Sequence, residues 1–315
     1  MRDFSGKTAV ITGAGSGMGR YLAVLLAKAG ANVAICDVNE ESLNDTAKMV
    51  KKYNVGISTH VVDMGDMDQI ETLPDAVLSQ HGAVDLVFNN AGVTMGSTFS
   101  GMLEEDWDWV MNINLNGVVK ASRVFLPLLK DRPEAVLVNT SSIFGMIAVP
   151  GQTVYHATKF GVRGFTESLA KEFKGTSVQV HCVHPGHVGT NIIDNSRFNI
   201  DDERFMNQQI DKDKMAERFR TGGMHPSRAA EIILKGVKQN KRRIFVGLDA
   251  KLMDLAQRIT PMHYDWLLPI INLPLYLIRN KKPLRSESQW DSGTGLRNIQ
   301  RIDPNAEDDT RTPGI

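Results

Sequence analysis

The chain has 315 residues, of which 42% are apolar, so it can bury a large core as one main domain. Lysines plus arginines number 36 and aspartates plus glutamates also 36, and this zero net charge provides no global field that would concentrate nucleic acid. Cys36 and Cys182 each lie inside an apolar run, and residues 1–6 lack the apolar stretch of a secretory signal. We therefore expect a cytoplasmic protein without a disulfide framework and without a nucleic-acid partner.

Short runs rich in valine, alanine and isoleucine alternate with longer segments of helical period from Lys7 to about Val188. This alternation is typical of repeated strand–helix units around a parallel sheet. Right-handed crossovers then predict an α/β fold, a Rossmann-type doubly wound parallel sheet of about seven strands with helices on both faces. The predicted strands are Thr8–Thr12, Asn32–Cys36, Ile57–Val62, Leu86–Asn89, Ala135–Asn139, Val178–Val183 and, after a helix over about 226–239, Arg243–Val246.

The predicted domain organisation is one large α/β domain followed by a C-terminal extension. Residues 1–250 form the domain, and within it the periodicity weakens over about 191–223, which indicates a mobile flap made of short helices. Residues 251–289 form an apolar extension, and the polar residues 290–315 form a loosely held tail.

The most apolar part of the extension is Trp266–Ile278, which reads WLLPIINLPLYLI. Its 13 residues are too few to cross a bilayer, which takes roughly 20. We interpret it as a lid over the substrate pocket or a subunit contact. The alternative is peripheral membrane attachment, helped by Arg279, Lys281 and Lys282.

A glycine-rich turn follows the first predicted strand and precedes a helical pattern over 20–29. Glycines allow a tight turn and a close backbone approach, so amides at the start of the helix can meet a pyrophosphate. The residues expected to contact a dinucleotide here are Gly13, Ser16, Gly17, Met18 and Gly19.

Asp37 ends the second predicted strand, roughly 20 residues beyond the glycines, where a carboxylate can accept hydrogen bonds from the adenosine ribose hydroxyls. Its negative charge would repel a 2′-phosphate. The sequence therefore predicts NAD(H) as cofactor in preference to NADP(H). A turn or cap role for this aspartate is the structural alternative.

Three motifs occur in a fixed order: Thr-Gly-x-x-x-Gly-x-Gly at 12–19, Asn-Asn-Ala-Gly at 89–92, and Tyr155-x-x-x-Lys159. With them the sequence resembles the short-chain dehydrogenase/reductase superfamily over about residues 5–250. The glycine spacing is that of its shorter branch, rather than of the sugar-nucleotide epimerases. The resemblance implies hydride transfer between a nicotinamide cofactor and an alcohol or ketone, and it specifies the reaction better than the substrate.

Tyr155 and Lys159 stand four residues apart, on one face of a predicted helix. By itself such a pair could simply lie on the surface. The resemblance implies that Tyr155 transfers the proton and that Lys159 also bonds the nicotinamide ribose. A free tyrosine has a pKa of about 10, and lowering it towards neutrality takes about 4 kcal/mol, which a close lysine and a nicotinamide cation could supply.

The resemblance also implies a serine and an asparagine in the catalytic set. The serine stands thirteen residues before the tyrosine, which selects Ser142 to hold the substrate oxygen and leaves Ser141 a structural role. Asn114 matches the asparagine before Leu-x-Gly, implied to hold a water that links the lysine to solvent. Asn112 and Asn116 fit that spacing less well.

Further cofactor contacts follow from the same resemblance, at the adenine ring, the adenosine ribose, the nicotinamide carboxamide and the pyrophosphate. They are Asp63, Met64, Asn90, Ala91, Gly92, Pro185, Gly186, Val188 and Thr190, together with Tyr155 and Lys159.

Three histidines surround Pro185, at positions 181, 184 and 187. We predict no metal, because Pro185 and Gly186 interrupt any helix and zinc needs three or four converging ligands. We interpret the histidines as polar side chains that line the cofactor mouth. His184 departs from the family pattern, which often has asparagine there.

The leading hypothesis is an NAD-dependent enzyme that interconverts a secondary alcohol and a ketone, with a noncatalytic dinucleotide sensor or scaffold as the alternative. An apolar pocket lining predicts a hydrophobic or aromatic small-molecule substrate. The expected lining residues are Ile143, Phe144, Met146, Ile147 and Val149 on one side and Phe198, Phe205 and Met206 on the other. By resemblance, the protein forms a homodimer or homotetramer through the helices that contain Asn114 and Tyr155.

Overall fold

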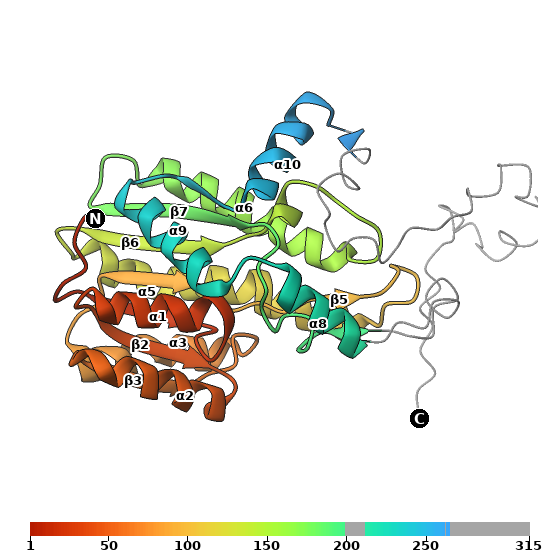
Figure 1. Ribbon diagram of the computed structural model, residues 1–315. Coiled ribbons are helices and arrows are strands. Elements are labelled where there is room, and N and C mark those ends of the chain that lie inside the picture. Colours follow the sequence, from red (N-terminus) through yellow and green to blue (C-terminus); the bar gives the residue numbers. More distant parts are fainter. Residues whose placement is uncertain (199–211, 262, 265–315) are drawn as a thin grey trace, which may run out of the picture. The chain divides into compact units, whose positions relative to one another are not determined.

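A computed structural model of the chain describes residues 1–198, 212–261 and 263–264 (Figure 1). The strands are β1 (Thr8–Thr12), β2 (Asn32–Asp37), β3 (Ile57–Val61), β4 (Leu86–Asn89), β5 (Met95–Gly96), β6 (Ala135–Thr140), β7 (Val178–Pro185), β8 (Arg197–Phe198) and β9 (Arg243–Val246). The α-helices are α1 (Gly17–Lys28), α2 (Glu40–Val50), α3 (Met67–His81), α4 (Glu104–Met111), α5 (Gly117–Lys130), α6 (Thr153–Glu172), α8 (Lys212–Gly222), α9 (Pro226–Lys238) and α10 (Leu248–Ile259). Short 3-10 turns cover η1 (Lys51–Tyr53) and η3 (Ile143–Gly145), and a π-helical turn covers η2 (Asn112–Asn116).

Seven strands form one parallel sheet in the order β3-β2-β1-β4-β6-β7-β9, which confirms the predicted doubly wound architecture. The order reverses between β1 and β4. Crossovers leave in opposite directions there, so a crevice opens at the carboxyl ends of these strands.

Side chains of each strand alternate between two helical layers. In β1, Ala9 and Ile11 pack in the core that contains α1, α2 and α9, whereas Val10 packs in the core of α3 and α5. Figure 1 shows helices covering both sides of the sheet. Burial on both faces is why the inner strands read as continuous apolar runs, since each buried Val, Leu or Ile contributes about 1.5–3 kcal/mol, whereas the edge strand β3 is partly exposed and more polar.

Strand boundaries differ from prediction by up to two residues. β7 runs on to Pro185 because its register with β9 continues to the Pro185–Val246 pair. α1 begins at Gly17 rather than at Arg20, so the last glycines of the turn already belong to the first helical turn.

Beyond β7, the described part of the predicted flap contains a short strand and a helix. β8 pairs in parallel with β5, which joins the flap to the loop after β4, and α8 has 11 residues. Residues 199–211 of the flap lie outside the described residues, as do Trp266–Ile278 and the tail. α10 crosses the predicted boundary at residue 250 and contacts β9 and η3.

Candidate active site

Two adjoining cavities open at the carboxyl ends of the strands. One of about 510 Å³ lies over the glycine turn, and one of about 190 Å³ lies over Tyr155. The lining residues that they share are Met18, Asn90, Gly92, Thr190 and Ile192. The two cavities are therefore parts of one crevice.

The glycine turn lines the larger cavity and has no room for side chains. Gly13 has φ +64°, and a Cβ there would lie 2.7 Å from the Cα of Ala91. A Cβ at Gly19 would lie 2.1 Å from the carbonyl oxygen of Gly13, so Gly19 keeps α1 close to the turn and does not itself line the crevice. Ser16 precedes α1 without capping it through its side chain. The first amides of α1 are thus available to an anion.

Asp37 lines the larger cavity next to the glycine turn. Its Oδ2 accepts a hydrogen bond from the amide of Gly15 at 2.8 Å, and its Oδ1 accepts one from the amide of Asn39 at 3.0 Å. Each carboxylate oxygen retains a second lone pair, so hydroxyl groups can still bind. The predicted turn role and the predicted ribose role are therefore compatible.

Thr12 positions the residues at the end of β4. Its Oγ1 accepts hydrogen bonds from the amides of Asn90 at 3.0 Å and Ala91 at 3.1 Å. The side-chain amide of Asn90 donates to the Thr12 carbonyl at 3.1 Å, which leaves its buried Oδ1 without a partner in the part of the chain that the structure describes. Asn90 lines both cavities, so a ribose hydroxyl bound there is a suitable donor to this oxygen.

Asp63 and Met64 also line the larger cavity. Asp63 Oδ1 accepts a hydrogen bond from the amide of Gly65 at 2.7 Å, which fixes its loop. Met64 is buried against the core of α3 and α5. Both line the cavity, as predicted for residues near the adenine ring.

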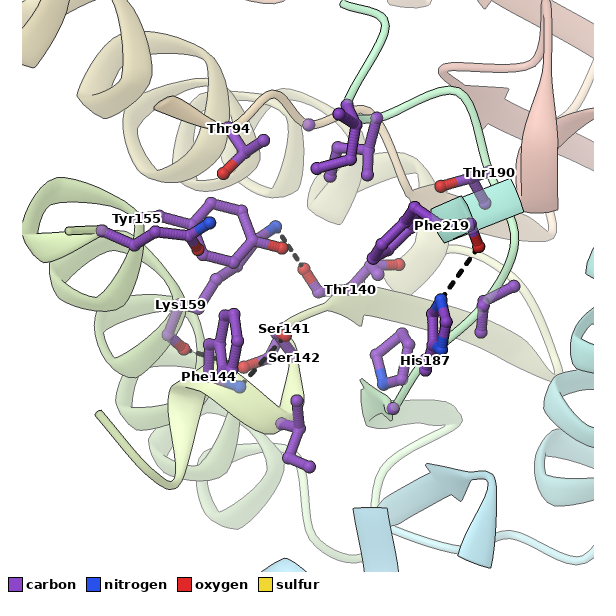
Figure 2. Close-up of a pocket in the computed structure, with 18 of the residues that line it drawn as sticks. Thr94, Thr140, Ser141, Ser142, Phe144, Tyr155, Lys159, His187, Thr190 and Phe219 are labelled. Carbon is purple, nitrogen blue, oxygen red and sulfur yellow. Dashed lines mark hydrogen bonds between the residues drawn. The ribbon is translucent and has the colours of Figure 1, made fainter. Parts of the chain in front are cut away.

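Tyr155, Lys159 and Ser142 converge on the smaller cavity (Figure 2). The Lys159 ammonium lies 5.5 Å from the centre of the Tyr155 ring and donates to the Thr140 carbonyl at 3.1 Å. Ser142 Oγ accepts from the amide of Phe144 at 3.1 Å, which holds it at the start of η3. Ser141 also lines the cavity, but its hydroxyl donates to the Lys159 carbonyl at 2.8 Å.

Burial is the main cause of the pKa shifts of Tyr155 and Lys159 in the protein without a cofactor. It raises the pKa of Tyr155 to about 12, although the hydrogen bond with Ser142 acts in the opposite direction. Burial also lowers the pKa of Lys159 to about 8. Both shifts disfavour the charged form. Activation of the phenol therefore requires additional positive charge in the crevice.

Asn114 lies beneath the cavities, in the π-helical turn η2. Its side chain is fully buried and exchanges two hydrogen bonds of 2.8 Å with the backbone of Val93. A Cβ at Gly92 would lie 3.3 Å from both Asn114 Oδ1 and Lys159 Nζ. A Cβ at residue 92 would thus be a tight fit between these two side chains, which shows that Asn114 and Lys159 lie on either side of Gly92.

Comparison with known proteins agrees with this geometry. The family model described as short chain dehydrogenase matches residues 7–200, more than half of the chain. The chain belongs to the short-chain dehydrogenase family.

Related proteins cover most of this dehydrogenase. The SadH protein of Mycobacterium tuberculosis, named as an oxidoreductase, is 37% identical over 271 residues, which is 85% of this chain and 95% of SadH. The 3-oxoacyl-[acyl-carrier-protein] reductase FabG of Thermotoga maritima is 37% identical over 59% of this chain and 75% of its own. A Burkholderia phymatum short-chain dehydrogenase solved with NAD is 29% identical, covers 82% of this chain and 95% of its own, and has a TM-score of 0.74. A metagenomic short-chain oxidoreductase solved with NADP is 25% identical, covers 78% and 99%, and has a TM-score of 0.62.

The loop after β7 forms the wall of the dehydrogenase crevice where the nicotinamide is expected. Pro185, Gly186, Val188 and Thr190 all line the smaller cavity. The carboxylate of Asp249, in the first turn of α10, accepts a hydrogen bond from the amide of His187 at 2.6 Å. Sequence reasoning missed Asp249, because nothing local connects residues 62 positions apart.

The prediction that all three histidines line the cofactor mouth is wrong for two of them. His181 and His184 are fully buried inside β7, and only His187 lines the cavity. His181 bonds the Lys241 carbonyl at 2.7 Å, and His184 approaches the Ser142 carbonyl at 3.3 Å. A strand covered on both faces buries its side chains whichever way they point, whereas His187 follows the strand end. Among the described residues, no cluster of three metal-binding side chains occurs.

The predicted substrate lining is correct in part. Ile143, Phe144 and Val149 line the cavity, but Met146 and Ile147 turn inward and pack against Met253. Phe198 packs on Gly96 instead of facing the cavity, and Phe205 and Met206 lie outside the described residues. Residues that were missed complete the wall, namely Thr94, Pro150, Gln152, Ile192, Ile193, Met215 and Phe219.

Proposed function

We propose that this short-chain dehydrogenase interconverts a secondary alcohol and a ketone by hydride transfer with NAD(H). The supporting observation is that Tyr155, Lys159 and Ser142 line an apolar cavity continuous with the glycine-turn crevice. A bound nicotinamide dinucleotide would supply the hydride donor or acceptor, and the crevice is the place in the chain suited to it. Carbon and oxygen of the substrate would then lie beside the nicotinamide and the phenol respectively.

In ketone reduction, the Tyr155 hydroxyl donates its proton to the carbonyl oxygen as hydride arrives at the carbonyl carbon. In alcohol oxidation, the phenolate takes that proton back. Ser142 Oγ hydrogen-bonds the same oxygen and stabilises its developing charge. Lys159 holds the ribose and its positive charge favours the phenolate, and Asn114 positions a water next to Lys159 for proton exchange.

A bound nicotinamide would add positive charge beside the phenol. At about 5 Å and an effective dielectric constant of about 20, one positive charge stabilises a phenolate by about 3 kcal/mol, or about 2 pKa units. Because the pKa of about 12 already applies with Lys159 in place, a bound cationic nicotinamide would be the added charge and would lower it by about 2 units, to about 10.

The lining of the larger cavity favours NAD(H) over NADP(H). Its described residues include two carboxylates, Asp37 and Asp63, and no lysine or arginine. A 2′-phosphate carries nearly two negative charges and is bound by basic side chains, usually arginine. One solved relative contains NAD and another contains NADP, so the proposed preference for NAD(H) is argued from the residues of this chain.

The side chains around Tyr155 favour a hydrophobic substrate. Ile143 and Phe144 form one side of the wall, and Ile192, Met215 and Phe219 form the other. The FabG relatives are named for the reduction of 3-oxoacyl groups, and a keto group fits the same chemistry here.

We further propose a homodimer or homotetramer that pairs through the helices carrying Asn114 and Tyr155, and a cytoplasmic location. Phe160 is exposed on α6 and supports such a contact. Sedimentation of the wild type and of Phe160→Glu tests it, with a monomeric variant as the expected result and unchanged sedimentation as the contrary one.

Contact with a membrane surface remains a proposal for the C-terminal extension. Within the described ranges, no helix is both long and apolar enough to span a bilayer. α10 nevertheless exposes Leu248, Leu252, Leu255 and Ile259, which repeat at helical spacing on one side. Because α10 leads into the apolar residues 266–278 and the basic residues 279–282, we propose an anionic bilayer surface as the occupant of this face.

Activity with a substrate panel tests the proposed reaction. Purified protein with NAD+ and secondary alcohols of increasing hydrophobicity should form NADH, and Tyr155→Phe should abolish this turnover while NADH binding persists. Tyr53→Phe, a tyrosine outside both cavities, is the matched control and should remain active. Full activity of Tyr155→Phe would contradict the proposal.

A further inference from the structure

Two buried oxygens in the wall of the smaller cavity lack a hydrogen-bond partner among the described residues. They are Oγ1 of Thr94, a residue that is 3% exposed, and Oε1 of Gln152. Both residues line the cavity that contains Tyr155. A buried hydroxyl or amide without a partner is unfavourable, and because both residues border a cavity, a ligand in that cavity can supply the missing hydrogen bonds.

Other polar side chains of this wall are already engaged. Ser142 accepts from the amide of Phe144, Lys159 donates to the Thr140 carbonyl, and His187 bonds the Phe219 carbonyl at 2.9 Å. The orphaned oxygen of Asn90 belongs to the dinucleotide side, because Asn90 lines both cavities. Thr94 and Gln152 line only the smaller cavity and are not needed for proton transfer or for the cofactor.

The fold brings Thr94 and Gln152 together on the Tyr155 side. Gln152 is the residue before α6, so it stands three positions, or about 4.5 Å along the helix axis, from Tyr155. Ser97 ties the loop of Thr94 to this helix start through a hydrogen bond from its amide to the Gly151 carbonyl at 3.0 Å. Figure 2 shows Thr94 on the same side of the cavity as the Tyr155 ring, away from His187 and Phe219.

We propose that Thr94 and Gln152 form a polar subsite for a second oxygen of the substrate. The proposal rests on the proposed function and deepens it. The threonine hydroxyl can donate, and so can the glutamine amide after rotation, so both can bind a carbonyl oxygen. About one helical turn separates Gln152 from Tyr155, and Thr94 lines the same cavity, which places this oxygen close to the reacting carbon. The substrate class is therefore a ketone with a second carbonyl or hydroxyl group nearby, and the rest of the molecule is apolar.

Two ketones of the same chain length separate the contribution of the second oxygen. Ethyl 3-oxohexanoate carries an ester carbonyl two carbons from its keto carbon, and 4-nonanone has the same skeleton without it. With NADH, Thr94→Val and Gln152→Met should each lower kcat/KM for the keto ester about tenfold, the effect of one lost hydrogen bond, and leave 4-nonanone nearly unchanged. Thr72→Val, an exposed threonine of α3, is the control and should change neither.

Stability provides an independent readout. Because Thr94→Val replaces an unpaired buried hydroxyl with a methyl group of the same shape, its Tm should stay the same or rise. A large loss of Tm would mean that the hydroxyl has a partner in the protein, which would overturn the subsite.

The remaining outcomes separate the subsite from the proposed function. Equal losses for both ketones, or no loss for the keto ester, would overturn the subsite and leave the dehydrogenase function intact. If the wild type reduces neither ketone, the proposed function fails for this class of ketone. Binding of the keto ester to the NAD+-loaded wild type and variants then decides whether the subsite exists. Binding that both variants lose would support the subsite, and binding that both retain would refute it.

Discussion

Replacing Asp37 with asparagine should convert a strong preference for NAD(H) into near indifference. The substitution keeps the shape of the side chain and removes its charge. For NAD+, the ribose hydroxyls lose charge-assisted hydrogen bonds, which are worth about 1.5–3 kcal/mol. For NADP+, a repulsion disappears: with a 2′-phosphate about 5 Å away at an effective dielectric constant of about 20, it amounts to about 3 kcal/mol per phosphate charge before screening by salt.

The ratio of kcat/KM for NAD+ to that for NADP+ should therefore fall by on the order of a thousandfold in Asp37→Asn. Initial rates with one secondary alcohol and each cofactor measure it. Asp63→Asn is the matched control, because Asp63 also lines the cavity, at its adenine end, and its loss should weaken both cofactors alike. An unchanged ratio in Asp37→Asn, or an equal change in Asp63→Asn, would refute the assignment of the ribose role to Asp37.

Two further predictions concern stability and the C-terminal helix. The pKa of Lys159 is about 8 in the folded protein against 10.5 ordinarily, so between these values the unfolded chain binds more protons than the folded one. The free energy of unfolding of the cofactor-free protein should therefore rise by about 3 kcal/mol across this pH window, and urea unfolding of Lys159→Met should lack the rise. In liposome flotation, Leu252→Glu with Leu255→Glu should reduce recovery of the full chain with anionic phospholipid vesicles, whereas Leu103→Glu, as exposed as Leu255 at 54%, should not. Equal recovery of the wild type, the double variant and Leu103→Glu would contradict the membrane contact.

Most of the sheet could be predicted because its strands are buried on both faces. Such strands contain uninterrupted apolar residues, and the turn chemistry between them is local in sequence. Gly13 and Gly19 illustrate this, since a close approach that excludes any Cβ leaves a glycine in the sequence. The short pairing of β5 with β8 could not be predicted, because two-residue strands have no periodicity.

The substrate wall was harder to predict, because it depends on the direction of side chains in irregular segments. Met146 and Ile147 follow Phe144 within one turn, yet η3 directs them into a small core with Met253 while Phe144 faces the cavity. Apolar residues in a loop do not reveal which of them faces a ligand. Thr94 and Gln152 became candidates only when the structure showed that their oxygens are buried without partners.

The central physical claim is that positive charge in the crevice lowers the pKa of one buried phenol. Ultraviolet titration of the wild type minus that of Tyr155→Phe isolates the ionisation of Tyr155. Without dinucleotide, this difference should show no phenolate until the pH approaches the pKa of about 12. With saturating NAD+, ionisation should begin about 2 pH units lower, and an unchanged titration in the presence of NAD+ would contradict the account.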